Sequence, residues 1–419
     1  MEKQRVLIVN KFYYRRGGDC IHALALERLL AARGHEVAVL ACAHPQSLPS
    51  AWSGYWPAPV DFRGSFAGRF RAARRMLGHD GTVRSVRRLL RDFRPDVVHL
   101  HNIHSHLSPV VAREARAYGC RVVWTLHDYK PVCPAYTLLC GGRVCTECIG
   151  RPSAVVRNRC IQDSLAASLA ARAEAVRWNT ECLQRWTDVF VCPSEFLRSV
   201  MLRAGFDASR LVVIPNFCPS EFTGLPVLPP SDAEPYYCYV GRISPEKGVA
   251  TLLRAAARLP YKLKIAGDGP MLQQLMSRYS AFGNIDWLGQ LDGPGVAALL
   301  GGARLSVVPS EWHENCPLGV IESLCAGTPV AASGMGGIPE LLAAEPLASR
   351  LFPAADARAL AAAVTSLWEN GPSHEERHDV ARRSRLRHSP GAYYDRLIRV
   401  YSPESSLQSD YNQLNRKIS

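Results

Sequence analysis

The sequence contains no long apolar segment. No run of about 18 apolar residues occurs in its 419 residues, which argues against a helix that spans a bilayer. The first apolar run, at 6–9, is too short for a signal peptide and predicts a strand instead. We therefore expect a cytoplasmic protein.

The sequence has too few cysteines for a disulfide-stabilised scaffold. The chain has 14 cysteines, about 3% of its residues, far below the density of a small disulfide-stabilised scaffold. Most are scattered, which is typical of small buried apolar side chains. Five lie within 28 residues and are considered below: Cys133, Cys140, Cys145, Cys148 and Cys160.

Acidic residues are scarce in the first half. Residues 1–220 carry 31 Lys+Arg and 17 Asp+Glu, a net charge of +14, whereas the remainder carries a net charge of −1. Within 63–94 there are ten arginines and two acidic residues. Charge concentrated in this way indicates an anionic partner, either a membrane surface or a nucleic acid.

The spacing of these arginines favours the membrane surface. Those at 84, 87, 88 and 91 fall on one helical face, without the interleaved aromatic residues of a protein that binds single-stranded nucleic acid. We expect no nucleic acid partner. Docking on anionic lipid would place the protein on the inner face of the cytoplasmic membrane.

Short apolar runs alternate with helical patterns along most of the chain. Continuous apolar strands separated by helices predict an α/β fold with doubly wound parallel sheets. The expected strands of the first part are 6–9, 37–40, 97–100, 122–126, 189–191 and 211–214. Those of the second part are 236–240, 262–265, 285–288, 305–308 and 329–332.

The length predicts more than one domain, because a single hydrophobic core stops growing near about 250–300 residues. A proline-rich break at 215–235 separates the two series of strands. The predicted parts are a first Rossmann-like domain (1–217) with a cysteine-rich insert (130–162), a linker (218–235), a second Rossmann-like domain (236–385), a late helix (386–402) and a polar tail (403–419). Ligands of open α/β sheets bind at the carboxyl ends of strands, so facing domains would place the site in the cleft between them.

Two basic residues follow the expected strand at 236–240. Arg242 and Lys247 supply positive charges five residues apart, and a departing diphosphate needs such charges to stabilise the negative charge that develops on it. A surface loop with two solvated bases is the alternative. A second loop, after the next strand, can approach a base or phosphate closely and consists of Gly267, Asp268 and Gly269.

Two glutamates follow the strand at 305–308. Seven residues separate Glu314 from Glu322, so one carboxylate can take sugar hydroxyls and the other a ribose. The intervening backbone N–H groups, of residues Asn315 to Gly319 with Leu318 among them, would face a phosphate at a helix N-terminus. A solvated helix face is the alternative, but the apolar neighbours of Glu322 disfavour it.

Residues able to contact a sugar also follow strands of the first part. Gly17 and Gly18 precede a helix, which suits a phosphate or sugar near backbone N–H groups, although a plain strand–helix turn is the alternative. His127, followed by Asp128, comes after the strand at 122–126 and can hydrogen-bond a sugar when neutral, unless it is a buried structural histidine. A metal site is disfavoured for the four histidines of 99–106, because only one face of a strand can converge on an ion.

In this order and spacing the motifs resemble those of family 4 glycosyltransferases, across about residues 5–400. The motifs that carry the resemblance are Gly-Arg (241–242) with Lys-Gly (247–248), Ala-Gly-Asp-Gly-Pro (266–270), the Glu314/Glu322 pair, Ala-Gly-Thr-Pro-Val (326–330) and Gly-Gly-Ile-Pro-Glu (336–340). The resemblance implies a retaining enzyme of the GT-B fold, whose last helix crosses back to the first domain. It also implies that no cofactor is required, because the leaving diphosphate itself deprotonates the acceptor.

The resemblance implies a role for each matching residue. Arg242 and Lys247 would hold the donor diphosphate, Glu322 the ribose, and Glu314 the hydroxyls of the donor sugar as a catalytic residue. Other donor contacts would come from Gly17, Gly18, Gly267, Asp268, Gly269, Asn315, Leu318 and Gly319. His127 would be the second catalytic residue, with His101, Asn102 and Asp128 on the acceptor side.

The cysteine-rich insert has the spacing of a four-ligand metal site. Cys133, Cys145, Cys148 and Cys160 are separated by 11, 2 and 11 residues, which in a reducing cytoplasm favours structural zinc over disulfides. Free thiols in a packed loop are the alternative, and Cys140 would be spare. The insert follows His127 and Asp128, so we expect it to shape the acceptor pocket.

These features together predict a transferase that moves a sugar from a nucleotide diphosphate sugar to a hydroxyl of a glycan or lipid-linked acceptor, in cell-surface polysaccharide synthesis. The alternative is a nucleotide-sugar epimerase of the same fold, against which the glutamate pair argues. A sugar-binding protein without catalysis is a further alternative. The sequence leaves the nucleotide and the sugar undetermined.

Overall fold

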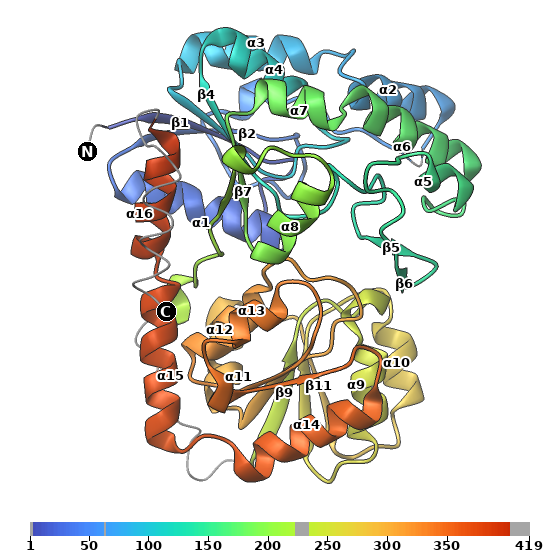
Figure 1. Ribbon diagram of the computed structural model, residues 1–419, viewed down its shortest axis with the longest axis vertical. Coiled ribbons are helices and arrows are strands. Elements are labelled where there is room, and N and C mark those ends of the chain that lie inside the picture. The colour runs from blue at the N-terminus through green and yellow to red at the C-terminus, as the bar shows by residue number, and fades with distance from the viewer. Residues whose placement is uncertain (1–2, 63, 223–233, 403–419) are drawn as a thin grey trace. The chain divides into compact units, whose positions relative to one another are not determined.

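The computed structural model describes residues 3–62, 64–222 and 234–402 and divides the chain into two compact units (Figure 1). The first comprises residues 1–141, 145–214 and 394–419, and the second comprises 142–144 and 215–393. No helix in the described residues is long and apolar enough to cross a membrane. The expected tail, and most of the expected linker, lie outside the described residues.

The first unit is built on a parallel sheet of six strands. Their order is β2-β1-β3-β4-β7-β8, with adjacent strands parallel throughout. The strands are β1 (Arg5–Val9), β2 (Glu36–Leu40), β3 (Val97–Leu100), β4 (Arg121–Thr125), β7 (Val189–Cys192) and β8 (Leu211–Val213). Valine-rich segments form these strands because their side chains are buried on both faces of the sheet.

Helices cover this sheet through apolar faces. In α3, Val86, Leu89, Leu90 and Phe93 recur at helical spacing and pack in the core. The helices of the unit are α1 (Gly18–Ala32), α2 (Phe66–Met76), α3 (Thr82–Phe93), α4 (Val110–Tyr118), α5 (Ala154–Arg157), α6 (Leu165–Arg177), α7 (Thr180–Trp186) and α8 (Glu195–Arg203). A hairpin of β5 (Leu139–Cys140) and β6 (Arg143–Val144) lies within the cysteine-rich segment.

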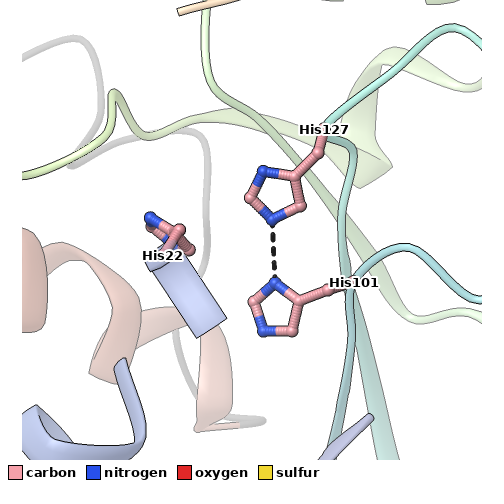
Figure 2. Close-up of side chains that lie close together, drawn as sticks. All are labelled: His22, His101 and His127. Carbon is pink, nitrogen blue, oxygen red and sulfur yellow. Dashed lines mark hydrogen bonds between the residues drawn. The ribbon is translucent and has the colours of Figure 1, made fainter. Parts of the chain in front are cut away.

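Strand order brings three histidines of the first unit together. His22 lies on α1, and His101 and His127 follow β3 and β4, which are adjacent in the sheet (Figure 2). Their convergence follows from the carboxyl ends of parallel strands meeting at one edge.

The second unit repeats this plan. Its parallel sheet has the order β11-β10-β9-β12-β13-β14. The strands are β9 (Tyr236–Val240), β10 (Lys262–Ala266), β11 (Ile285–Gly289), β12 (Leu305–Val308), β13 (Val330–Ser333) and β14 (Ser349–Phe352). The helices are α9 (Val249–Ala256), α10 (Leu272–Arg278), α11 (Gly293–Gly302), α12 (Leu318–Cys325), α13 (Ile338–Leu342), α14 (Ala357–Asn370) and α15 (His374–Arg387). The predicted α/β architecture with two doubly wound sheets is confirmed.

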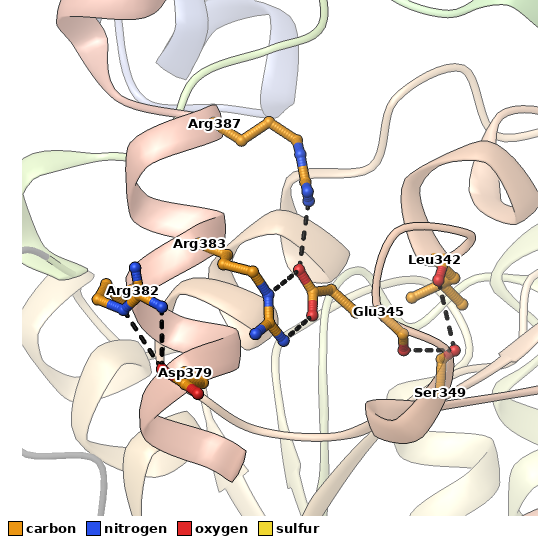
Figure 3. Close-up of polar contacts among 7 residues, drawn as sticks. All are labelled: Leu342, Glu345, Ser349, Asp379, Arg382, Arg383 and Arg387. Carbon is orange, nitrogen blue, oxygen red and sulfur yellow. Dashed lines mark hydrogen bonds and ion pairs between the residues drawn. The ribbon is translucent and has the colours of Figure 1, made fainter. Parts of the chain in front are cut away.

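A buried carboxylate attaches α15 to the second unit (Figure 3). Glu345 is 2% exposed, and it accepts hydrogen bonds from Arg383 at 2.7 and 3.3 Å and from Arg387 at 3.4 Å. Arg382 on the same helix instead pairs with Asp379 at the surface, at 3.1 Å. Because a buried carboxylate without a cation destabilises a protein, the contacts of Arg383 and Arg387 with Glu345 hold the helix in place.

The chain returns to the first unit through α16 (Pro390–Tyr401). Within that unit the Tyr394 hydroxyl lies 2.7 Å from His35 Nε2, and the Tyr401 hydroxyl lies 2.6 Å from His99 Nδ1. Arg121 donates to the carbonyl of Val400 at 2.7 Å. The last described helix therefore packs against residues in and next to the strands of the first sheet.

Candidate active site

Close backbone contacts hold the strand-end loops of the second unit together. Gly267 follows β10 with φ +142°, and a Cβ at this position would lie 1.9 Å from the carbonyl oxygen of Gly241. Gly336 follows β13 with φ +63°, where a Cβ would lie 2.0 Å from the carbonyl of Glu314. Any other residue would push these loops apart, so the glycines set the shape of this edge.

An ion pair between a partly buried lysine and a buried glutamate joins two of these loops. Lys247 Nζ lies 2.7 Å from Glu314 Oε1, and Ser310 donates its hydroxyl to the same oxygen at 2.6 Å. Burial raises the pKa of Glu314, but the Lys247 charge and the hydrogen bonds outweigh burial and hold the pKa below its ordinary value. The carboxylate is therefore ionised, with Oε1 already engaged by a cation.

Arg242 has a different environment. Its guanidinium pairs with Glu246, four residues on, and 61% of its side chain is exposed. The loop is also pinned by the Tyr239 hydroxyl, which donates to the Arg242 carbonyl at 2.8 Å. Arg242 can therefore exchange its surface partner for an anionic ligand at little cost.

Glu322 lies on α12 in apolar surroundings. Burial, with a smaller contribution from the Glu221 charge, raises the pKa of Glu322 to about 7. Pro317 is the N-cap of α12 and supplies no capping side chain. The N–H groups of Leu318 and Gly319 at this helix start are accordingly available to a ligand.

Three imidazoles converge in the first unit (Figure 2). His101 Nδ1 lies 2.9 Å from His127 Nε2, and one nitrogen from each of His22, His101 and His127 lies within 4.8 Å of the others. Burial lowers the pKa of His22 and His101 far below the ordinary value, and that of His127 to about 4. All three rings are neutral at neutral pH.

The hydrogen bond assigns the tautomers of the pair. His101 Nε2 is buried and has no partner among the described residues. A buried N–H without an acceptor costs more than a buried lone pair, so we assign the proton of His101 to Nδ1, which donates to His127 Nε2. His127 then carries its proton on Nδ1 and can donate it.

A three-histidine metal site fits this geometry poorly. Two nitrogens bound to tetrahedral zinc lie roughly 3.3 Å apart. His101 Nδ1 and His127 Nε2 are only 2.9 Å apart and are joined by a hydrogen bond. Burial is the main cause of the lowered His127 pKa, and the Asp19 charge, which raises it, acts more strongly on this ring than the Lys11 charge, which lowers it. His22 itself was not predicted, because a single histidine in a helix carries no local signal of a site.

Asn102 is held at the start of α1. Its side-chain amide donates to Asp19 Oδ2 at 2.8 Å, and Lys11 Nζ lies 3.9 Å from the same oxygen. Asp19 directly follows Gly17 and Gly18, so the glycine turn and Asn102 belong to one cluster. The structure thus places two predicted groups together that the sequence had treated separately.

Asp128 and the other histidines contact different partners. Asp128 Oδ1 accepts a hydrogen bond from the Lys130 backbone at 2.9 Å, and burial raises its pKa. His99 bridges Thr125 and Tyr401 at 2.7 and 2.6 Å. It is His101, not Asp128, that hydrogen-bonds the His127 ring.

The predicted zinc ligands interact with one another and with Cys140. The Cys160 thiol hydrogen-bonds Cys140, and burial followed by this bond raises its pKa to about 12, with Cys148 and Cys133 also nearby. Cys145 interacts with Cys148. Cys140 therefore lies beside Cys160, and among the described residues no three sulfurs lie mutually within 4.8 Å.

Two family models match the chain. The model described as Glycosyltransferase Family 4 matches residues 16–222, and the one described as Glycosyl transferases group 1 matches residues 226–387. The phosphatidyl-myo-inositol mannosyltransferase of Mycolicibacterium smegmatis is 28% identical over 362 residues, covering 84% of this chain and 82% of the relative. The glycogen synthase of Mycobacterium tuberculosis is 28% identical over 399 residues, covering 88% and 86%.

The fold is shared with solved structures. Anabaena HepE in complex with UDP matches with a TM-score of 0.64 at 16% identity, over 94% of this chain and 98% of that one. Sucrose-phosphate synthase from Thermosynechococcus elongatus matches with a TM-score of 0.62 at 19% identity, over 94% and 99%. These matches show a GT-B fold.

The raised pKa of Glu322 predicts a pH-dependent stability. Because the folded carboxyl has a pKa of about 7 against an ordinary 4.5, the folded state binds more protons than the unfolded state between these values. Stability contributed by the protonated form is present below pH 4.5 and lost as the pH rises through 7. Glu322→Gln should therefore gain stability relative to the unsubstituted protein as the pH rises from 5 to 8, as measured by urea unfolding.

A second variant tests the cause. Glu221→Gln removes the neighbouring charge but keeps Glu322. The pKa of Glu322 should therefore fall, and the pH range over which stability is lost should move to lower pH. Equal pH dependence in the Glu322→Gln variant and the unsubstituted protein would contradict the assignment.

Proposed function

The chain belongs to the family 4 glycosyltransferases, and from this premise we propose that it is a retaining hexosyltransferase that uses a nucleotide diphosphate sugar. The proposed acceptor is a hydroxyl of a glycan or a lipid-linked saccharide in cell-surface polysaccharide synthesis. The observation that carries the proposal is the Lys247–Glu314 ion pair at the strand ends of the second unit. A nucleotide-sugar epimerase would use the same donor and is separated by the test below.

The donor side follows from this pair. A bound diphosphate would give Lys247 a second anionic partner and would recruit Arg242 from the surface, so both cations would stabilise the charge that develops on the leaving group. Glu314, ionised and aligned by Lys247 and Ser310, would accept hydrogen bonds from hydroxyls of the donor sugar. Glu322 would accept hydrogen bonds from the hydroxyls of the ribose.

Glycine loops would complete the donor pocket. Gly267, Asp268 and Gly269 follow β10, and Asn315, Leu318 and Gly319 stand at the start of α12, where backbone N–H groups can bind phosphate. No resident cofactor takes part in this scheme.

The acceptor side would be neutral. His127 would donate from Nδ1 to a hydroxyl near the reacting carbon, while His101 holds its ring. Asn102 and Asp128 would bind acceptor hydroxyls nearby. In the proposed retaining step the bond from the anomeric carbon to the diphosphate oxygen breaks, the acceptor oxygen bonds to that carbon on the same face, and the diphosphate takes the acceptor's proton.

A donor panel tests the enzyme assignment. Purified protein should release nucleoside diphosphate from one of the UDP-, GDP- or ADP-sugars when given a saccharide acceptor, and the product should keep the donor's anomeric configuration by NMR. Glu314→Gln should lower kcat by at least about 100-fold, because it removes an ionised contact to the reacting sugar. The matched exposed change Glu369→Gln should leave kcat within about twofold.

Three results would contradict parts of this proposal. Unchanged activity of Glu314→Gln would reject its contact with the sugar. Inversion at the anomeric carbon would reject the retaining mechanism. Conversion of the donor sugar without any acceptor would identify the epimerase.

We also propose that the first unit docks on an anionic membrane surface, on the inner face of the cytoplasmic membrane. Phe66 and Phe70 lie one turn apart on α2 and are 84% and 58% exposed, on the side opposite its buried residues. The same helix carries four arginines, at 69, 71, 74 and 75, and α3 carries four more. Exposed aromatic rings beside bases are typical of helices that lie in a membrane interface.

Vesicle flotation tests the docking. The protein should float with phosphatidylglycerol vesicles, less so as salt rises, and not with neutral phosphatidylcholine vesicles. The double change Phe66→Ser with Phe70→Ser should reduce the bound fraction at least about tenfold, whereas Phe282→Ser, an exposed ring of the second unit, should not. Binding that is absent or independent of salt would contradict it.

We further propose structural zinc in the cysteine-rich segment. The predicted ligands are Cys133, Cys145, Cys148 and Cys160, and the contact of Cys140 with Cys160 makes Cys140 a competing fourth ligand. The raised pKa of the Cys148 and Cys160 thiols, to about 12, means that zinc would displace protons to bind thiolates. Such a site would be structural, with all four positions taken by sulfur.

Metal analysis tests this site. Protein purified without chelator should contain about one zinc per chain, and Cys148→Ser should lose it while Cys182→Ser, outside the segment, keeps it. Less than about half an equivalent of zinc in the unsubstituted protein would contradict the proposal. Cys140→Ser and Cys145→Ser distinguish the fourth ligand.

A further inference from the structure

The first unit contains a cavity of about 1260 Å³ that the proposed reaction does not use. Segment 58–61, α2, residues 79–81, α3 and α4 line it. Its volume exceeds the roughly 300–1000 Å³ typical of small-molecule sites, so it has room for more than an inorganic ion.

Arginines dominate the charge of this cavity. Six line it, against three acidic residues: Arg71, Arg74, Arg75, Arg84, Arg87 and Arg91, with Asp61, Asp80 and Glu114. On α3 the three arginines recur at spacings of three and four residues, which places them on one helical face. The cavity therefore favours an anion.

Two of the three acidic residues pair with arginines. Arg75 pairs with Asp80, and Glu114 lies 2.6 Å from Arg87 and 2.8 Å from Arg113. These ion pairs hold the walls of the cavity in place. They offset the charges of Arg75, Arg87 and Arg113, but not those of the other arginines.

Three guanidinium groups remain without a partner. The side chains of Arg71, Arg84 and Arg91 have no hydrogen bond or ion pair within the described part of the chain, although each lines the cavity. Guanidinium groups bind phosphate oxygens through paired N–H bonds, which makes phosphate esters and diphosphates the anions that such a set recognises best. Arginine is suited to this because it stays charged at every physiological pH.

The cavity also has an apolar wall. Pro59, Val83, Leu90 and Ala117 line it beside the arginines. The exposed Phe66 and Phe70 lie on α2, the helix that also supplies Arg71 and Arg74. A ligand that suits both surfaces has a phosphate end and a hydrocarbon end.

We infer that this cavity binds the phosphate or diphosphate end of a lipid-linked acceptor, with the first part of its hydrocarbon chain against the apolar wall. The inference rests on the proposed function in that the acceptor is lipid-linked. It differs from membrane docking, because it requires a defined site for one headgroup and not the summed charge of a surface.

A soluble probe separates the two sources of phosphate. Farnesyl diphosphate carries a diphosphate and a short hydrocarbon chain without a bilayer, and its binding to the 419-residue chain is measured by calorimetry. Inorganic pyrophosphate lacks the chain, farnesol lacks the charge, and phosphatidylglycerol vesicles supply bulk anionic lipid. Farnesyl diphosphate should bind at least about tenfold more tightly than pyrophosphate and farnesol, because only it contacts both walls.

Matched variants locate the site. Arg84→Gln and Arg91→Gln should each weaken farnesyl diphosphate about tenfold, since each removes a charge-assisted contact. Arg88→Gln is the control: it lies on the same helix, changes the net charge equally, and contacts Tyr55 and Asp92 outside the cavity. It should change the affinity less than about twofold.

A donor-side measurement keeps this test independent of the enzyme assignment. UDP affinity and thermal stability should change little in all three arginine variants, because none of the three is among the proposed donor contacts and each side chain is exposed. Retained UDP binding with lost farnesyl diphosphate binding supports the cavity. Activity that fails in the donor panel leaves this binding result unaffected.

Three outcomes would overturn the inference. One is no binding of farnesyl diphosphate to a protein that floats with phosphatidylglycerol vesicles, which assigns the arginines to bulk membrane charge. Another is equal weakening by Arg84→Gln and Arg88→Gln. The third is equal affinity for pyrophosphate and farnesyl diphosphate, which removes the hydrocarbon wall from the site.

Discussion

The ion pair of Lys247 with Glu314 is the contact on which the second unit's site depends. The two residues follow β9 and β12, which are neighbours in the sheet, so the pair ties two strand ends together. Removing the cation from a buried carboxylate lowers the free energy of unfolding of a protein by about 3–5 kcal/mol. Loop geometry and site charge are therefore set by one interaction, and Gly336 packs against it because a side chain there would meet the Glu314 backbone.

The first unit presents the opposite electrostatics at its strand ends. Burial keeps His22, His101 and His127 neutral, so that three rings can lie together without repulsion. The ring–ring hydrogen bond then orients His127 without a carboxylate partner. One unit thus offers fixed charges suited to a charged leaving group, and the other offers neutral donors and acceptors suited to hydroxyls.

Most of the fold was predictable because strands buried on both faces appear in the sequence as short apolar runs. Two of the elements that were not predicted are β14 and α15. β14 reads Ser-Arg-Leu-Phe, an edge strand with no apolar run, and the largely polar α15 is held by contacts such as those of Arg383 and Arg387 with Glu345. In both cases the stabilising partners lie elsewhere in the chain.

The sequence by itself determined which residues stand at strand ends, because local hydrophobic patterning marks where each strand stops. It therefore placed Arg242, Lys247, His101 and His127 in loops that can meet a ligand. Only the tertiary structure decided which groups meet: His22 with His101, Cys140 with Cys160, and three unpaired arginines around one cavity. Those meetings depend on strand order and helix packing, which join residues far apart in the chain and leave no local pattern.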